Sequence, residues 1–340
     1  MIIRKNLSLR SIYEFTGHHL IWLTAWMLIV TLIYNSTHWK IITIPWLPLS
    51  LVGTAVAFYV GFKNVQSYDR IWEARKVWGA MTNNSRMLAT MIKNFRSEDA
   101  GLNDGSELRK QIIFRHIAYL YQLREQLLEP TSWEHVSIDM LGIGYWNKRR
   151  RARLYNRFQE ELNSVAASTY LSDEEKTSLQ QFNNKAVQLL DIQSAMLQQL
   201  YQNKAINSMQ HMELQKTINN FYDEQGRVER IKRTPFPRKY ASFSFIFVCI
   251  FVFLLPFGIV GEFSKLGAAG VWLSIPVGVI IGWVYVTMEL IGDYSENPFE
   301  GLHNDIPMLS ICRNIEIDLL QMTGEKNIPK PIQAKEDILF

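Results

Sequence analysis

Four stretches of this chain are long, apolar and free of Asp, Glu, Lys and Arg, and they constrain its fold more than any other feature. They cover residues 20–35, 41–62, 240–261 and 266–288. A helix needs roughly 20 apolar residues to cross the hydrocarbon core of a bilayer. The last three stretches reach that length, and the first does so with its uncharged flanks. Because a helix satisfies all of its backbone groups within one span, we expect four transmembrane helices.

Basic residues lie mainly on one side of these expected spans. The flanks on that side contain Arg4, Lys5, Arg10, Lys63, Arg70, Arg75, Lys76, Arg230, Lys232, Arg233, Arg238 and Lys239. The short loops on the other side contain Lys40 in one case and the balanced pair of Glu262 and Lys265 in the other. Since cytoplasmic loops carry the excess of Lys and Arg, we expect both termini and the long middle region to be cytoplasmic.

The spans divide the chain into five expected segments. These are a cytoplasmic N-terminal segment (1–19), a first transmembrane hairpin (20–62), a helical cytoplasmic region (63–239), a second transmembrane hairpin (240–288) and a cytoplasmic C-terminal segment (289–340). Apolar residues of the middle region recur at helical spacing over 66–94, 108–128, 148–166 and 173–212. Ser172 with Glu175 beyond it is typical of a capping box at a helix start. Strand-like alternation is nowhere sustained, so the expected fold class is an all-α membrane protein.

The sequence carries no signature of an enzyme or of a bound cofactor. A phosphate-cradling glycine loop, an HExxH zinc motif and a nucleophile elbow are all missing. The two cysteines, Cys249 and Cys312, lie far apart and suggest neither a disulfide framework nor a metal cluster. Basic loops explain the net charge of +4, so nucleic acid is not an expected partner. The basic run at 148–153 is a solvated helix face, a contact for anionic lipid, or a group that attracts anions to a vestibule.

The second span carries an apolar stripe that could line a constriction. Thr54, Phe58 and Phe62 recur every fourth residue, so a helix places them on one face. Small residues on the other faces, such as Gly53 and Ala57, permit close helix contacts. Several copies of this stripe around an axis would form a narrow apolar passage. The alternative is that the stripe is buried in packing or faces lipid.

Three segments next to the spans resemble the bacterial bestrophin-like family of ion channels. The first, after the second span, reads GFKNVQSYDRIWEARKVWG, with NNSR following. The second, before the third span, reads ERIKRTPFPRKY. The third, after the fourth span, reads ELIGDYSENPFEGLHNDIPMLSICRNIEIDLL. They occur in the family's order around a matching span pattern, and only the stretch at 98–225 is less distinctive.

This resemblance implies a homopentamer in the bacterial inner membrane, with one central pore whose neck is lined by the second span. The neck positions of the family match Thr54, Phe58 and Phe62, although the first is usually larger and apolar. A second, cytoplasmic aperture matches Met209 or Met212. The implied function is a channel for chloride or another monovalent anion. A sodium-conducting channel of the same fold and a non-conducting membrane scaffold or sensor remain the alternatives.

Two polar groups of residues complete the expected site. Asp69, Arg70, Glu73 and Arg75 can pair at helical spacings or across subunits. They are expected to form a polar network below the neck, which Asp293 and Glu296 could join. Animal members of the family bind calcium through an acidic run after the Asn-Pro-Phe motif. That run is missing here, so no tight metal site is expected, with Asn297 and Asp305 as weak candidates.

Overall fold

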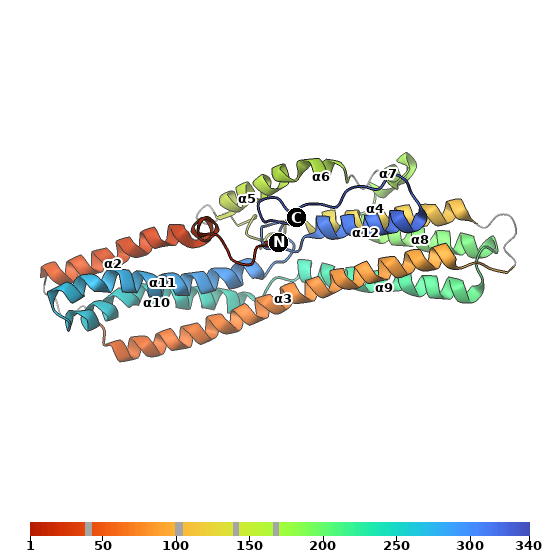
Figure 1. Cartoon of the computed structure of the whole chain (residues 1–340). Coiled ribbons are helices and arrows are strands. Elements are labelled where there is room, and N and C mark those ends of the chain that lie inside the picture. Colours follow the sequence, from red (N-terminus) through yellow and green to blue (C-terminus); the bar gives the residue numbers. More distant parts are fainter. Residues whose placement is uncertain (38–42, 99–104, 139–142, 166–169) are drawn as a thin grey trace. The chain divides into compact units, whose positions relative to one another are not determined.

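The computed structural model describes residues 1–37, 43–98, 105–138, 143–165 and 170–340. Lys40, expected in a loop between two spans, lies outside these ranges. The helices are α1 (Leu9–Ile12), the π-helical turn η1 (Tyr13–Gly17), α2 (His18–Thr37), α3 (Trp46–Asn94), α4 (Ser106–Leu127), α5 (Ile143–Arg157), α6 (Gln159–Asn163), α7 (Asp173–Leu179), α8 (Lys185–Gln202), α9 (Ser208–Arg233), α10 (Arg238–Ser264), α11 (Ala268–Ser295) and α12 (Met308–Thr323) (Figure 1). Extended pairing in the described ranges is limited to isolated bridges such as Ile2 with Ile338.

The chain divides into two compact units. The first, here called the span unit, comprises Arg4–Arg70 and Pro235–Glu296. The second, here called the α4 unit, comprises Met1–Ile3, Ile71–Thr234 and Asn297–Phe340. Helix α3 contributes residues to both units without a break, although the sequence suggested a segment boundary after Phe62.

Four helical stretches among the described residues are long and apolar enough to cross a membrane. They are Leu9–Thr37, Trp46–Asn94, Arg238–Ser264 and Ala268–Ser295. The second begins at Trp46, several residues after the start of the expected span. Pro45 accounts for this start, because proline disfavours helical geometry at the residue before it and cannot donate a backbone hydrogen bond.

Close helix contacts hold the span unit together. Helix α11 packs against both α10 and α2 (Figure 1). Gly278 leaves no room for a side chain beside Met27, and Gly258 leaves none beside Leu49. Small residues at such positions let helices approach closely, which is how helices associate in a membrane. Tyr285 adds a hydrogen bond from its hydroxyl to the carbonyl oxygen of Gly53, at 3.0 Å.

Helix α4 lies at the centre of the α4 unit. It packs against α8, α9 and α12 (Figure 1). Its buried residues occupy every face of the helix, including Ile112, Ile113, Ile117 and Leu120. The six consecutive residues at 116–121 are all buried, so the helices packed against α4 enclose this part of it on every side.

Two of the expected helices of the middle region are divided in the structure, whereas those at 66–94 and 108–128 correspond to α3 and α4. The expected helix at 173–212 was wrong, because the structure divides it among α7, α8 and the start of α9. The expected helix at 148–166 divides between α5 and α6, and residue 166 lies outside the described ranges. The capping box of Ser172 and Glu175 is confirmed. A second one, Asn207 with Gln210, starts α9 and was missed in the sequence.

His116 is enclosed in the core of the α4 unit and should make stability depend on pH. Its Nε2 lies 2.9 Å from Ser85 Oγ, and its Nδ1 lies 3.1 Å from Gln193 Oε1. Burial lowers the pKa of His116 from 6.5 to about 4. The unfolded chain therefore binds a proton at pH values where the folded chain does not. The resulting stabilisation is complete above pH 6.5 and is lost as the pH falls toward 4, by about 3 kcal/mol in total.

Thermal unfolding of wild type and His116→Gln, at about pH 7 and about pH 4, tests this dependence. We expect acid to lower the Tm of the wild type more than that of the variant. Asp305 acts in the opposite direction, because burial raises its pKa to about 7 and its protonation favours the folded state as the pH falls. Since both proteins keep Asp305, the difference between them isolates His116. An equal fall in Tm would contradict the prediction.

Candidate functional site

Thr54, Phe58 and Phe62 share one face of α3, as their spacing predicts. Phe58 is 80% exposed and Phe62 is 48% exposed. Thr54 Oγ1 donates to the carbonyl oxygen of Ser50 at 2.9 Å, so its hydroxyl is directed back along the helix. Val56 and Val60 on the other side of α3 are buried in the core of the span unit. The stripe is thus open to a pore, to another subunit or to lipid.

Lys63 follows this stripe and is buried, at 1% exposure. Its Nζ lies 2.5 Å from Glu289 Oε1 and 3.5 Å from Asp293 Oδ1, both on α11. The other Glu289 oxygen accepts a hydrogen bond from Ser244 Oγ of α10, at 2.5 Å. Three helices therefore meet at one polar cluster, which we call the Lys63 cluster (Lys63, Ser244, Glu289 and Asp293).

The Lys63 cluster was missed in the sequence, where Lys63 counted only as a charge marking the cytoplasmic side. A signal was available, since Lys63 and Glu289 each directly follow a charge-free stretch. Such residues are usually solvated at the membrane surface. Their pairing across 226 residues of sequence is a product of the tertiary fold.

Further polar contacts tie α3 to α11 and to the chain after it. Asn64 Nδ2 donates to the carbonyl oxygen of Met288 at 3.0 Å. Arg70 Nε donates to the carbonyl oxygen of Glu296 at 2.7 Å. Arg238 at the start of α10 pairs with the Glu296 carboxylate at 3.6 Å. In this structure α3 is therefore joined to α11 at Asn64 and to Glu296 at Arg70.

The residues of the expected polar network reach other elements in the structure. Arg70 binds Glu296, as described above, so Glu296 does join it. Glu73 pairs with Arg230 at 2.6 Å. Arg75 contacts Met1 Sδ at 3.6 Å, and Asp69 is exposed. A single network that unites all of these side chains remains a prediction.

Met209 and Met212 lie in the first turns of α9. Met209 is 78% exposed and Met212 is 59% exposed, whereas Leu214 just beyond them is buried in the core. Both methionine side chains are therefore accessible on the surface of the α4 unit. Which of the two forms the aperture remains a prediction.

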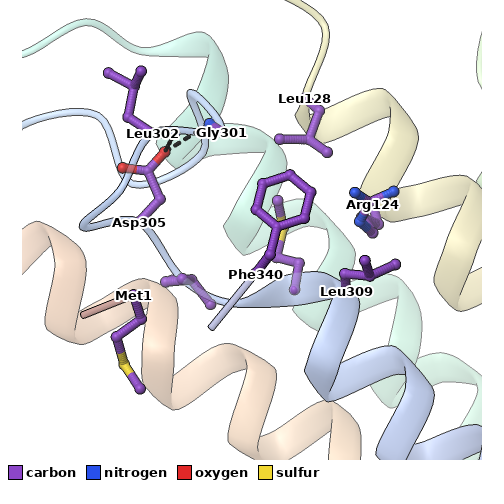
Figure 2. A pocket seen from close by; sticks show the side chains of 10 residues that line it. Met1, Arg124, Leu128, Gly301, Leu302, Asp305, Leu309 and Phe340 are labelled. Carbon is purple, nitrogen blue, oxygen red and sulfur yellow. Dashed lines mark hydrogen bonds between the residues drawn. The ribbon is translucent and has the colours of Figure 1, made fainter. Parts of the chain in front are cut away.

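The Asn-Pro-Phe segment begins the last part of the α4 unit. Asn297 Nδ2 donates to Glu300 Oε1 at 2.9 Å. Asp305 Oδ2 accepts hydrogen bonds from the backbone N–H groups of Gly301, at 2.7 Å, and Leu302, at 3.0 Å (Figure 2). Gly301 has a φ of +77°, a conformation that favours glycine.

Asp305 lines a small cavity with Arg124 and Phe340 (Figure 2). Burial, together with the nearby Glu300, raises the pKa of Asp305 to about 7. A carboxyl group that is only partly ionised near neutral pH is a weak ligand for calcium, which prefers charged oxygens. Among the described residues, no group of three or more His, Cys, Asp or Glu side chains is placed to hold a metal ion.

Comparison with known families decides the identity of the chain. Residues 10–321 match the family described as "Bacterial/Fungal Bestrophin protein". The chain belongs to the bacterial and fungal bestrophin family. The resemblance seen in the segments around the spans is thereby confirmed.

Curated relatives of this bestrophin are named as channels. It is 27% identical over 285 residues to the Escherichia coli K12 "Voltage-dependent anion channel-forming protein YneE", covering 84% of this chain and 79% of the relative. It is 28% identical over 297 residues to the similarly named protein alr2987 of Nostoc, covering 87% of this chain and 83% of the relative.

Solved bestrophin structures share the fold. A bacterial bestrophin homologue from Klebsiella pneumoniae superposes with a TM-score of 0.71 at 23% identity, covering 91% of this chain and 98% of that one. A single-residue variant of that homologue gives a TM-score of 0.73 at 22% identity, with coverage of 91% and 99%. With its family and its apolar helices, this bestrophin is an integral membrane protein.

Proposed function

We propose that this bestrophin assembles into a homopentameric channel of the bacterial inner membrane, conducting chloride or another monovalent anion. The observation that carries the proposal is the stripe of Phe58 and Phe62, exposed on a helix whose opposite side is buried. The relatives named as anion channel-forming proteins support it. Both the family and these names point to a channel rather than an enzyme.

In this proposal the stripe forms the neck of a central pore. Each subunit contributes Phe58 and Phe62, and an apolar ring of this kind stops ions by excluding water until the side chains move apart. Aromatic edges are electropositive, so rings turned edge-on favour anions. Thr54 forms the third ring of the neck, and its hydroxyl makes that ring more polar and better hydrated than an apolar residue would.

The membrane topology and the cytoplasmic site residues of the proposed channel follow from the family and the charge distribution. Both termini, the region at 63–239 and the segment at 289–340 are placed in the cytoplasm, where the basic flanks belong. The hairpins at 20–62 and 240–288 span the membrane. Met209 or Met212 forms the cytoplasmic aperture. Asp69, Arg70, Glu73 and Arg75 form the polar surroundings below the neck, and Asn297 and Asp305 hold no tightly bound metal.

One observation favours a cation channel as the second candidate. The Lys63 cluster places the carboxyl groups of Glu289 and Asp293 beside Lys63, which directly follows the stripe. Acidic groups near a pore mouth attract cations. Ion selectivity is therefore the part of the proposal that needs direct measurement.

Flux through liposomes containing the purified protein tests the proposal. We expect halide efflux well above that of protein-free liposomes, because the neck conducts when it opens. In a planar bilayer with asymmetric salt, the reversal potential should have the sign of anion flow. A reversal potential of the opposite sign would mean that the channel conducts a cation such as sodium instead of chloride. Passage of neither ion would sink the channel proposal and favour a membrane scaffold or sensor.

A further inference from the structure

The Lys63 cluster has an arrangement that suits movement. Glu289 and Asp293 are four residues apart on α11, so they lie about one helical turn apart, roughly 6 Å along the axis, on the same face. A single ammonium group faces both of them, at 2.5 Å from Glu289 and 3.5 Å from Asp293. The Glu289 side chain is only 6% exposed, whereas that of Asp293 is 37% exposed. The two carboxylates thus offer Lys63 two positions in different surroundings.

Lys63 has to keep a carboxylate partner wherever it moves. It is 1% exposed, and it lies on a helix that is long and apolar enough to cross a membrane. An unpaired buried charge is costly, and more so in a membrane. The lysine side chain is long and flexible, with a compact charge at its end, so it can exchange one carboxylate for the other without losing both.

The residues around the cluster suit such an exchange. A side chain at Gly292 would meet the end of the Asn64 side chain, so α3 approaches α11 closely at this position. Ser244 donates to the Glu289 oxygen that Lys63 does not bind. Glu289 would therefore keep one hydrogen bond after Lys63 has moved to Asp293.

We propose that Lys63 is a positioning residue that acts as a two-position latch on the neck, pairing with Glu289 in one gating state and with Asp293 in the other. Lys63 directly follows Phe62 on α3, so a movement of α3 that takes Lys63 from one carboxylate toward the other also moves the aromatic stripe. This inference rests on the proposed channel function, because its readout is the gating of that channel.

The latch predicts opposite effects for the two carboxylates. Glu289→Gln weakens the pairing of Lys63 with Glu289, which is the shorter contact in this structure. Asp293→Asn weakens the pairing of Lys63 with Asp293. In planar bilayers we expect the ratio of open to closed channels to move in opposite directions in the two variants, by about tenfold each. Ser244→Ala removes the hydrogen bond that Glu289 would keep after Lys63 has moved to Asp293. It should therefore shift gating in the same direction as Asp293→Asn, by a smaller factor.

Two further variants separate a latch from a purely structural role. Lys63→Arg keeps a cation at this position and should keep two gating states. In a Lys63→Met background, Glu289→Gln and Asp293→Asn should no longer shift gating in opposite directions. Glu262→Gln is the matched control, because Glu262 pairs with Lys265 at 2.8 Å in the same unit but in an exposed position. It should leave gating unchanged.

The outcomes are distinguishable from failure of the channel proposal itself. If the wild type passes no ions, the proposed function fails. If the wild type conducts but both carboxylate variants shift gating in the same direction, or neither differs from Glu262→Gln, the latch alone is wrong. Should Glu289→Gln fail to assemble, Asp293→Asn and Ser244→Ala must still shift gating in a common direction, and opposite shifts overturn the latch.

Discussion

Replacing both Phe58 and Phe62 with alanine should raise the ion flux of reconstituted channels by about tenfold, which corresponds to a barrier lower by about 1.4 kcal/mol. The bulky rings are exposed on α3, at 80% for Phe58 and 48% for Phe62, and their loss widens the passage that excludes water. Single-channel conductance and open probability are the measurements, and closure should become incomplete.

A matched aromatic residue controls for general effects of truncation. Phe245 on α10 is 54% exposed in the same unit, so Phe245→Ala removes a comparable ring away from the stripe. Its conductance should equal that of the wild type. The neck assignment fails if the double variant conducts and gates like Phe245→Ala, because the stripe would then face lipid.

Lys232→Met should lower the free energy of unfolding by about 3–5 kcal/mol, because it leaves a buried carboxylate without its partner. Lys232 is 7% exposed and forms an ion pair with Glu134, which is 1% exposed. Lys232 Nζ also donates to the carbonyl oxygen of Phe299 in the Asn-Pro-Phe segment, at 3.3 Å. Burial lowers the pKa of Lys232 and raises that of Glu134, and their attraction opposes both shifts.

Unfolding of the detergent-solubilised protein measures this loss, with two comparisons. The double variant Lys232→Met with Glu134→Gln removes both charges and should recover most of the stability. Lys216→Met breaks an exposed pair with Glu213 and should cost less than about 1 kcal/mol. A loss in Lys232→Met no larger than that in Lys216→Met would mean that the buried pair has no special importance.

The site was only partly predictable, for reasons visible in particular residues. The stripe of Thr54, Phe58 and Phe62 follows from helical spacing, and the structure leaves its three side chains exposed. Its assignment to a neck came from the family resemblance. The break before α9 was missed because Asn207 and Gln210 form their capping box within an otherwise helical pattern. Local capping outweighed periodicity there.

The sequence by itself determined that the protein is helical and has four helices long and apolar enough to span a membrane, because hydropathy and helical period act over neighbouring residues. It also determined the family, because the motifs are continuous segments. Only the tertiary structure decided that Lys63 is buried against Glu289 and that His116 lies between Ser85 and Gln193. These partners are far apart in the chain. The cost of burying a polar group without a partner selects such pairs once the helices pack, and no local pattern encodes them.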